Sequence, residues 1–419
     1  MNQKKYNYTL EYILFALLLI FYVIITFILF KNQAVNGVIY HDSNFEIDRF
    51  HSDMYAYMLE MQGLESGYNF PYPIFFKISA LFNLFFSPEN SVAIATCLLN
   101  AIAVVISKIT INRFVIGELK KQNNEEPDNK TKLITGIVVD FVVLALFFAS
   151  MLVPPHFYFG TKFRYLGVFS PNPYQNATYM AARPFAIISF LYFIKLIGEY
   201  EELKKENIKD YIIFAVIFLL STMTKPSFTI VLGMAAVILI FFRFFKNKCK
   251  TFKASIIMGL IFIPTLIDLL YQFKGVFMPD GQEDSGVGLC LGRIWLLYTN
   301  NMASSILLAM MFPIVVLIFN FNLLKEDYRF RFAWFFYFVS YFITFCFYEK
   351  GWRAVDFNFS WSYMYGLFFS FYAAIIVMIK DLMNRKRRLI GLAELLVFLG
   401  HLASGIWYFG QIFAGNSYY

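Results

Sequence analysis

Residues 12–30, YILFALLLIFYVIITFILF, form an apolar run near the start of the chain. A helix of about 20 predominantly apolar residues is long enough to cross the hydrocarbon core of a bilayer. Similar runs recur along all 419 residues, of which 59% are hydrophobic and only 15% charged. Soluble domains rarely carry so much apolar sequence. The pattern predicts an all-α, polytopic transmembrane helical bundle in which residues 1–419 form a single integral membrane domain.

The distribution of lysine and arginine predicts the topology. Lys4 and Lys5 precede the first run, and cytoplasmic loops usually carry an excess of basic residues. No small-residue cleavage site follows that run, so we expect it to remain as a span. About eleven spans, with the N-terminus inside and the C-terminus outside, put 25 of the 36 lysines and arginines on the cytoplasmic side. The predicted spans are 12–30, 90–109, 133–152, 183–198, 211–223, 226–244, 254–272, 301–320, 332–348, 362–379 and 389–410.

Residues 72–86 are apolar but form a shorter run than the predicted spans. If they crossed the membrane, the basic segment 108–132 would lie outside, against the distribution of lysine and arginine. We therefore predict that they form a helix in the membrane interface. This interfacial helix would belong to the first outer loop, residues 31–89.

Composition and short motifs also limit the kinds of ligand and partner that are expected. The net charge of +8 does not indicate a nucleic-acid partner, because the basic residues are divided by membrane side and do not form one face. The four cysteines form no CxxC pair, so neither a zinc site nor a disulfide framework is expected. The cytoplasmic loops contain no P-loop or glycine-rich nucleotide motif. No cofactor is indicated with certainty, and a divalent cation is left open.

The first outer loop contains the main candidate for catalysis. Asp53 lies between His51 and Tyr55, and Asp48 lies five residues before it. Five residues along a helix correspond to a rotation of roughly 140°, so the two carboxylates should not form a close pair. We predict that Asp53, with Asp48 in reserve, accepts a proton from an attacking hydroxyl, and that His51 or Tyr55 contacts the substrate. The alternative is a solvated helix at the membrane surface.

The second outer loop, residues 153–182, is dense in Asn, Gln and Thr beside basic residues. Polar groups near lipid need partners. A phosphate at the membrane surface would provide one for Lys162, Arg164 or Arg183, and Asn176 lies in the same region. The alternative is an interfacial belt of aromatic residues with snorkelling cations.

Two later segments add candidates for substrate binding. Lys225 lies at the turn between the fifth and sixth predicted spans, where it either contacts substrate or anchors the hairpin at the interface. The last outer loop, residues 349–361, combines Trp352, Arg353 and Asn358 with further acids and aromatic residues. Aromatic faces beside polar groups suit sugar rings, although an interfacial belt is again the alternative.

Asp140, Asp268 and His401 are ionisable residues that fall within or near the ends of predicted spans. An ionisable residue inside a membrane is a candidate for function. A proton or cation relay would need a chain of such groups across the bilayer, and these three are too few. Transport is therefore a weaker interpretation than enzymatic activity.

Taken together, these features resemble the GT-C superfamily of integral membrane glycosyltransferases. The resemblance covers an acid in a long first outer loop, a surface helix at 72–86 and about eleven spans. Asp53 does not belong to an Asp-Glu or Glu-Asp pair, which departs from the pattern of the superfamily. Short stretches also resemble uncharacterised Gram-positive members: NPYQNATY (172–179), RPF (183–185), TKPSF (224–228), GWR (351–353) and NFSW (358–361).

The resemblance implies an inverting hexosyl- or pentosyltransferase on the outer face of the bacterial cytoplasmic membrane. The donor would be a polyprenyl-phosphate-linked sugar, and the acceptor a glycan, a lipid-linked glycan or a protein. Asp53 would be the general base, while one or more of Arg164, Arg183, Lys225 and Arg353 offset the charge on the leaving phosphate. The nearest alternative is a polysaccharide polymerase or ligase that acts on lipid-linked glycans, and a transporter comes next.

These roles require residues from distant loops to converge. We expect at least two of the four cations to share a pocket with Asp53. We also expect Tyr or Trp from the second and last outer loops in its walls. An interfacial belt would instead distribute the cations around the rim of the protein, each reaching water separately.

Overall fold

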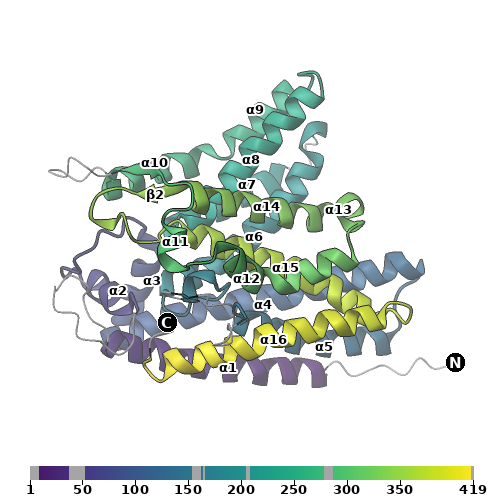
Figure 1. Cartoon of the computed structure of the whole chain (residues 1–419), viewed down its shortest axis with the longest axis horizontal. Coiled ribbons are helices and arrows are strands. Elements are labelled where there is room, and N and C mark those ends of the chain that lie inside the picture. Colours follow the sequence, from purple (N-terminus) through teal and green to yellow (C-terminus); the bar gives the residue numbers. More distant parts are fainter. Residues whose placement is uncertain are drawn as a thin grey trace.

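The computed structural model describes residues 9–36, 52–152, 162–163, 166–203, 208–277 and 286–416. Over these ranges the chain is almost entirely helical, with one two-stranded sheet (Figure 1). The elements are α1 (Thr9–Val35), α2 (Met54–Met61), α3 (Pro73–Asn83), α4 (Pro88–Asn123), α5 (Asn129–Phe148), η1 (Leu166–Phe169), α6 (Ala177–Glu199), η2 (Tyr200–Glu202), α7 (Ile208–Thr224), α8 (Ser227–Lys246), α9 (Phe252–Leu260), α10 (Ile263–Phe277), β1 (Val287–Leu289), α11 (Trp295–Tyr298), α12 (Met302–Phe319), α13 (Leu323–Glu326), α14 (Tyr328–Cys346), β2 (Phe347–Glu349), η4 (Gly351–Arg353), α15 (Ser360–Met383) and α16 (Arg388–Phe413).

Every predicted span coincides with a helix or a helix pair. In the described ranges, eight helices are long and apolar enough to cross a membrane: α1, α4, α5, α6, α8, α12, α15 and α16. The pair α9 and α10, bent by 49°, would provide a ninth span. The remaining two predicted spans correspond to α7 and α14, which are not among those nine. The all-α prediction is confirmed, and the long apolar helices indicate an integral membrane protein; the count of eleven stays a prediction.

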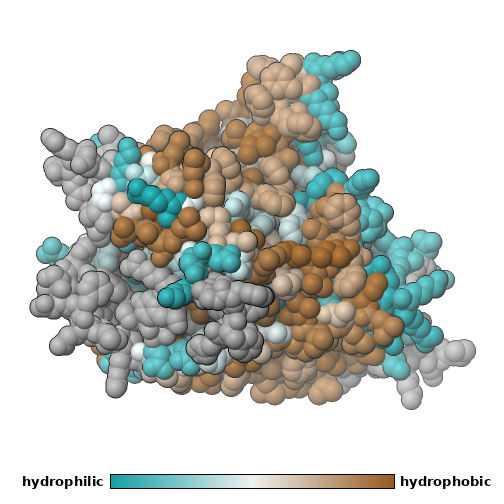
Figure 2. Space-filling view, viewed as in Figure 1, coloured by the Kyte–Doolittle hydropathy of each residue, from teal (hydrophilic) through white to brown (hydrophobic). Residues whose placement is uncertain are grey.

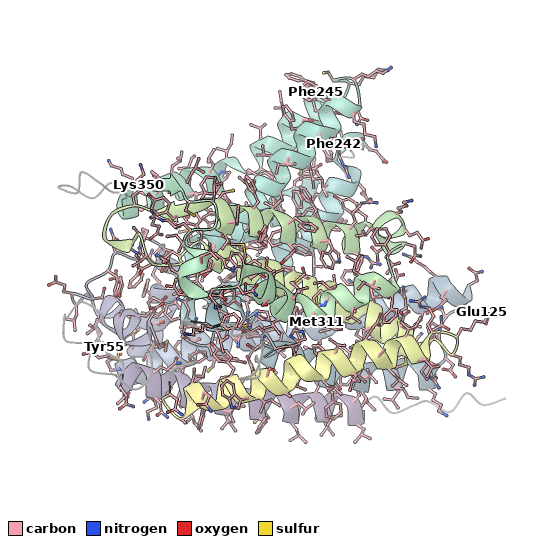
Figure 3. The ribbon with its side chains drawn as sticks, viewed as in Figure 1. Tyr55, Glu125, Phe242, Phe245, Met311 and Lys350 are labelled. Atoms are coloured by element: carbon pink, nitrogen blue, oxygen red, sulfur yellow. The ribbon has the colours of Figure 1, made fainter. Side chains whose placement is uncertain are left out.

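Predicted outer and cytoplasmic segments lie at opposite ends of the bundle. Figure 3 shows Tyr55 and Lys350 toward the left end and Glu125, from a predicted cytoplasmic loop, at the right end. Between the ends the visible surface is largely apolar (Figure 2). On α8, for example, Phe242 and Phe245 are 63% and 56% exposed. Large exposed apolar surfaces of this kind are typical of membrane contact.

The predicted surface helix is present as α3, which begins with Pro73 at its first turn. Its 11 residues are too few to cross a bilayer. One face of the helix packs against the protein and another is exposed: Phe75 is fully buried, whereas Leu81 is 59% exposed. The location of α3 in the membrane interface remains a prediction.

Backbone hydrogen bonds tie the predicted outer loops to one another. The N–H of Asp53 donates to the carbonyl of Gln175 over 3.2 Å, which joins the first loop to the second. Phe163 and Thr299 form an antiparallel bridge between the second loop and the third predicted outer loop, residues 273–300. β1 and β2 pair antiparallel and join the third loop to the last. Segments far apart in the sequence are thereby held together at one end of the bundle.

The ionisable residues considered for a relay belong to separate local networks. Lys108 on α4 bonds to Glu11 on α1 over 2.6 Å and also pairs with Asp140 on α5. Asp268 accepts a hydrogen bond from its neighbour on the next turn of α10. His401 Nδ1 and Nε2 both bond to backbone groups, of Ser150 and Phe312. Asp140, Asp268 and His401 therefore each have local partners that account for their place in the bundle, and they do not form one chain of ionisable groups.

Cysteine labelling tests the topology. In a Cys249→Ser background, which removes an exposed native thiol, Asn124→Cys should react only from the cytoplasmic side and Val355→Cys only from the outside. Both positions are exposed. Val168 also lies in a predicted outer loop, but it is only 7% exposed, so a cysteine there should react poorly from either side. Labelling of position 124 from outside would contradict the predicted orientation.

Candidate active site

A polar pocket of about 290 Å³ opens among the predicted outer loops. Ligand sites in proteins are usually concave and combine apolar walls with a few polar groups. The pocket is built from the first, second, third and last predicted outer loops together with the α7–α8 turn. Its lining residues are Ser52, Asp53, Tyr57, Tyr68, Phe70, Tyr72, Val168, Gln175, Asn176, Lys225, Tyr298, Arg353, Asp356, Phe357, Asn358, Ser360 and Trp361.

Asp53 directs its carboxylate into this pocket. It occupies the N-cap position of α2, where an aspartate often bonds to the first turn, but its side chain does not cap the helix. Instead, Oδ2 accepts hydrogen bonds from Asn176 Nδ2 at 2.5 Å and from the Tyr57 hydroxyl at 3.2 Å. Within the described ranges no donor bonds to Oδ1. One carboxylate oxygen is therefore held in place while the other is available to a ligand.

The environment of Asp53 alters its acidity. Burial raises the pKa of the Asp53 carboxyl above its usual value, because the charged form loses hydration. The charge of Lys225, hydrogen bonds from Asn176 and Tyr57, and the charge of Arg353 act in the opposite direction. The balance favours a carboxylate that binds a proton more readily than one in water, as a general base requires.

Asn176 connects this carboxylate to the start of α6. Its Oδ1 accepts hydrogen bonds from the Tyr179 N–H and the Thr178 hydroxyl, both at 2.9 Å, and so caps the helix. Its Nδ2 donates to Asp53 and, at 2.8 Å, to the Tyr57 hydroxyl. Because both ends of the amide are engaged, the side chain has one satisfied orientation. The start of α6 thus fixes the position of Asp53.

A second set of hydrogen bonds connects the residues around Asp53 and the second loop to α1 and α16. Ser52 Oγ lies 2.8 Å from the Gln175 carbonyl and 3.1 Å from Gln33 Oε1 on α1. Gln33 Nε2 donates to the Tyr174 carbonyl at 3.1 Å. The Tyr408 hydroxyl on α16 donates to Gln175 Oε1 at 2.7 Å. Helices from the two ends of the sequence therefore hold the second loop beneath the pocket.

Lys225 reaches the pocket from the turn between α7 and α8. It is 5% exposed, and its Nζ donates to Thr178 Oγ1 at 3.2 Å. The ammonium also lies 4.7 Å from the centroid of the Trp361 ring and 5.7 Å from that of Tyr72, within the range of cation–π attraction. Burial lowers the pKa of Lys225 to about 8, although the charge of Asp53 opposes this change. The turn therefore presents a largely desolvated cation to the pocket.

Arg353 contributes the second cation, but its charge is partly compensated. Its Nε lies 3.1 Å from Glu349 Oε2 and 3.7 Å from Asp356 Oδ2. Asn358 Nδ2 donates to the same Glu349 oxygen at 2.7 Å. Burial raises the pKa of Glu349, whereas the charge of Arg353 lowers it. These contacts brace the last outer loop and leave Lys225 as the less neutralised of the two pocket cations.

Five of the predicted site residues line the pocket together: Asp53, Asn176, Lys225, Arg353 and Asn358. Two of the four predicted cations thus share a pocket with Asp53, as expected. This convergence links residues from the first loop, the second loop, a helix hairpin and the last loop. A belt of separate interfacial cations does not describe this arrangement.

Other predicted site residues lie elsewhere. Arg183 on α6 is fully buried, where Nη2 donates to the Pro171 carbonyl at 2.8 Å and to Asn172 Oδ1 at 2.6 Å. It is not among the lining residues, and its contacts hold the second loop against α6. Lys162 is exposed and Tyr55 half-buried, and neither lines the pocket.

Four predictions fall outside the described part of the chain. Asp48, His51 and Arg164 belong to ranges that the structure does not describe. Trp352 lies in η4, but its side chain is likewise outside the described part.

The aromatic wall differs from the expectation. Trp361 comes from the last loop region, but the lining tyrosines come from the first and third loops, namely Tyr57, Tyr68, Tyr72 and Tyr298. Among the described residues the second loop contributes no lining tyrosine, because Tyr174 and Tyr179 are both fully buried in the core. The Tyr174 hydroxyl donates to the Phe147 carbonyl at 2.6 Å, and the Tyr179 ring lies 4.3 Å from that of Tyr365. The aromatic cluster YNFPY (68–72) is the feature of the sequence from which Tyr68 and Tyr72 could have been predicted to line the pocket.

An apolar cavity of about 340 Å³ borders the polar pocket. Tyr72 lines both spaces, and Pro226 and Phe359 of the apolar cavity directly follow Lys225 and Asn358 of the polar pocket. The change from polar to apolar lining thus occurs next to the Lys225 ammonium. The cavity is lined by Pro71, Tyr72, Pro226, Ile230, Met234, Leu269, Gln272, Phe273, Val287, Ile343, Phe347 and Phe359.

Comparison of the chain with protein-family models, with curated proteins and with solved structures found no match. Within the described ranges, no group of three or more His, Cys, Asp and Glu side chains is arranged to hold a metal ion. A divalent cation stays a prediction. The chemistry of the pocket residues is therefore the basis for a functional proposal.

Proposed function

We propose that this protein is a membrane glycosyltransferase that moves a sugar from a polyprenyl-phosphate-linked donor to an acceptor hydroxyl on the outer face of a bacterial cytoplasmic membrane. The convergence of Asp53, Lys225 and Arg353 on one pocket, bordered by an apolar cavity, carries the proposal. A lipid-linked sugar has three chemically distinct parts: a polar sugar, an anionic phosphate and a hydrocarbon chain. The two adjacent spaces offer an environment for each part.

The phosphate would lie at the boundary between the two spaces. Lys225 occupies that boundary, since the next residue, Pro226, already lines the apolar cavity. A buried, partly desolvated cation interacts strongly with an anion because little water screens the charge. The polyprenyl chain would then occupy the apolar cavity beside Tyr72, with the sugar in the polar pocket beside Asp53.

The reaction would be a single displacement. Asp53 takes the proton from the acceptor hydroxyl while the acceptor oxygen forms a bond to the anomeric carbon. The bond from that carbon to the phosphate oxygen breaks, and the phosphate leaves with the electron pair. Lys225 and Arg353 stabilise the negative charge that develops on the leaving group. Attack from the face opposite the phosphate inverts the anomeric centre.

The pocket walls are consistent with a sugar ligand. The rings of Tyr68, Tyr72 and Trp361 offer flat apolar surfaces, while Asn358 and Gln175 offer amide groups for hydroxyls. Aromatic residues with polar atoms suit ligands that are apolar on one side and polar on another. Acceptors of three classes fit this chemistry: a glycan, a lipid-linked glycan or a protein. Incubation of the reconstituted protein with a radiolabelled polyprenyl-phosphate hexose or pentose and an acceptor from one of these classes should transfer the label to the acceptor and release polyprenyl phosphate.

The pH dependence of kcat/KM should be bell-shaped. Activity should rise as Asp53 loses its proton, at a pH above the usual carboxyl range because burial raises its pKa. Activity should fall again near pH 8, where Lys225 loses the charge that stabilises the leaving phosphate. Initial rates measured from pH 4 to 10 would show both limbs. An alkaline limb that is unchanged in Lys225→Gln would contradict the role assigned to this ammonium.

A further inference from the structure

A second cavity, of about 510 Å³, lies between α4, α6, α14 and α15. It lies at the opposite end of the bundle from Asp53. α6 begins next to Asn176, which lines the candidate active site, and Lys195 lines this second cavity. At 1.5 Å per residue, the two positions are about 28 Å apart along the helix. The cavity is therefore distinct from the candidate active site.

The deeper walls of this cavity are apolar. Phe190 on α6 and Phe369 on α15 stack with their ring centroids 4.0 Å apart. Ala373 and Ile376 on α15 continue the wall in the direction of the predicted cytoplasmic end. Hydrocarbon would be well accommodated against these side chains, because they offer it no unsatisfied polar group.

The rim is basic. Arg113 on α4, Lys195 on α6 and Arg329 on α14 all line the cavity, and no acidic side chain does. Arg113 lies just beyond the predicted span 90–109, and Lys195 and Arg329 lie near the ends of α6 and α14 that are predicted to be cytoplasmic. The cations thus come from three helices and gather at one edge, whereas the apolar residues lie deeper in the bundle. Charge and apolar surface are separated along the expected membrane normal.

Two of the cations also have acidic partners outside the cavity. Lys195 pairs with Asp210 over 2.7 Å. Arg329 contacts both Glu118 over 2.5 Å and Asp327 over 3.1 Å, so its charge is largely compensated. Lys195 is largely exposed, and exposed pairs of this kind contribute little binding energy. Arg113 is exposed and, within the described ranges, has no ion-pair partner. Arg113 therefore provides the rim with a positive charge that no described acidic side chain neutralises, and this charge is available to an anionic ligand.

We propose that this cavity binds an anionic glycerophospholipid from the leaflet at the predicted cytoplasmic end. The phosphate would lie against Arg113, Lys195 and Arg329, and an acyl chain would pack against Phe190 and Phe369. Basic pockets between membrane helices on the cytoplasmic side are typical sites for anionic headgroups. A lipid matches the separation of cations and apolar wall, whereas a free phosphate would use only the rim.

Native mass spectrometry of the full-length protein in neutral detergent tests this proposal. With phosphatidylglycerol and phosphatidylcholine at equal concentrations, the wild-type protein should retain phosphatidylglycerol preferentially. Arg113→Gln should weaken that retention by about fivefold, the effect expected for one cation near an anionic lipid. Lys325→Gln provides a matched control, because Lys325 is an exposed cation that does not line the cavity. It should leave retention unchanged.

A second variant tests the apolar part without changing the charge. Ala373→Phe should narrow the wall and reduce retention of phosphatidylglycerol, and inorganic phosphate should not displace the bound lipid. Equal retention of the two lipids, or an Arg113→Gln variant that binds like the wild type, would overturn the proposal. Displacement by inorganic phosphate would instead indicate a free-anion site. These outcomes do not depend on whether the protein transfers sugars.

Discussion

Asp53→Asn should lower the rate of sugar transfer by on the order of 10²–10⁴-fold, the usual contribution of a general base. Asparagine has almost the same size as aspartate, and its amide oxygen can still accept hydrogen bonds from Asn176 and Tyr57. It cannot accept the proton of the acceptor hydroxyl. Transfer can be measured as polyprenyl phosphate released from a labelled donor by protein reconstituted in liposomes, with circular dichroism to show that the variant stays folded.

Asp356→Asn is the matched control for this prediction. Asp356 lines the same pocket, but its carboxylate lies 3.7 Å from Arg353 Nε and so has a local ion-pair partner. Its loss should reduce transfer much less than the loss of Asp53. Asp48→Asn should also have a smaller effect. If Asp48→Asn were inactive and Asp53→Asn near normal, the base would be Asp48. Full activity in both variants would favour a polymerase or ligase that does not depend on an acid in the first loop.

Lys225→Gln should reduce kcat/KM by about 10²–10³-fold, because it removes a charge that stabilises the leaving phosphate. Glutamine keeps a donor for Thr178 Oγ1, so the local hydrogen bond can be preserved. The same substitution should raise the pKa of Asp53 further, since Lys225 is the charge that most lowers it. The acidic limb of the pH profile should therefore move to higher pH.

Lys162→Gln is the corresponding control. Lys162 is exposed on the second outer loop and does not line the pocket, so its loss should leave kcat/KM nearly unchanged. An equal decrease in both variants would indicate a general electrostatic effect at the membrane surface. A shift of the acidic limb only in Lys225→Gln would be the specific sign of coupling between this ammonium and Asp53.

The helical bundle could be predicted from the sequence because each span is a local property. Residues 12–30 are apolar enough to be recognised without any partner. The short apolar run 72–86 could be predicted as a separate helix by length and flanking charge, and it appears as α3. Helix ends were harder to predict. The span predicted at 90–109 belongs to α4, which continues to Asn123, because residues beyond the bilayer can remain helical when other helices support them.

The candidate site was only partly predictable because it depends on contacts between distant segments. Asp53, Lys225 and Arg353 could be proposed from residue type and membrane side. Arg183 has the same chemistry in sequence, yet Asn172 and the Pro171 carbonyl engage it inside the protein. Sequence alone does not distinguish a cation that faces a pocket from one that ties a loop. Burial and hydrogen-bond partners make that distinction.

The pairing of β1 with β2 and the position of Arg353 also bear on how the protein is made. Asp53 emerges from the ribosome early, but Arg353 follows about 300 residues later, which takes about 15–60 s at usual rates of synthesis. Until the last outer loop has been translocated, the first two loops face water without their later partners. Full assembly of the pocket would therefore coincide with the end of membrane insertion, and a chain truncated before β2 would be an inserted protein without a complete site.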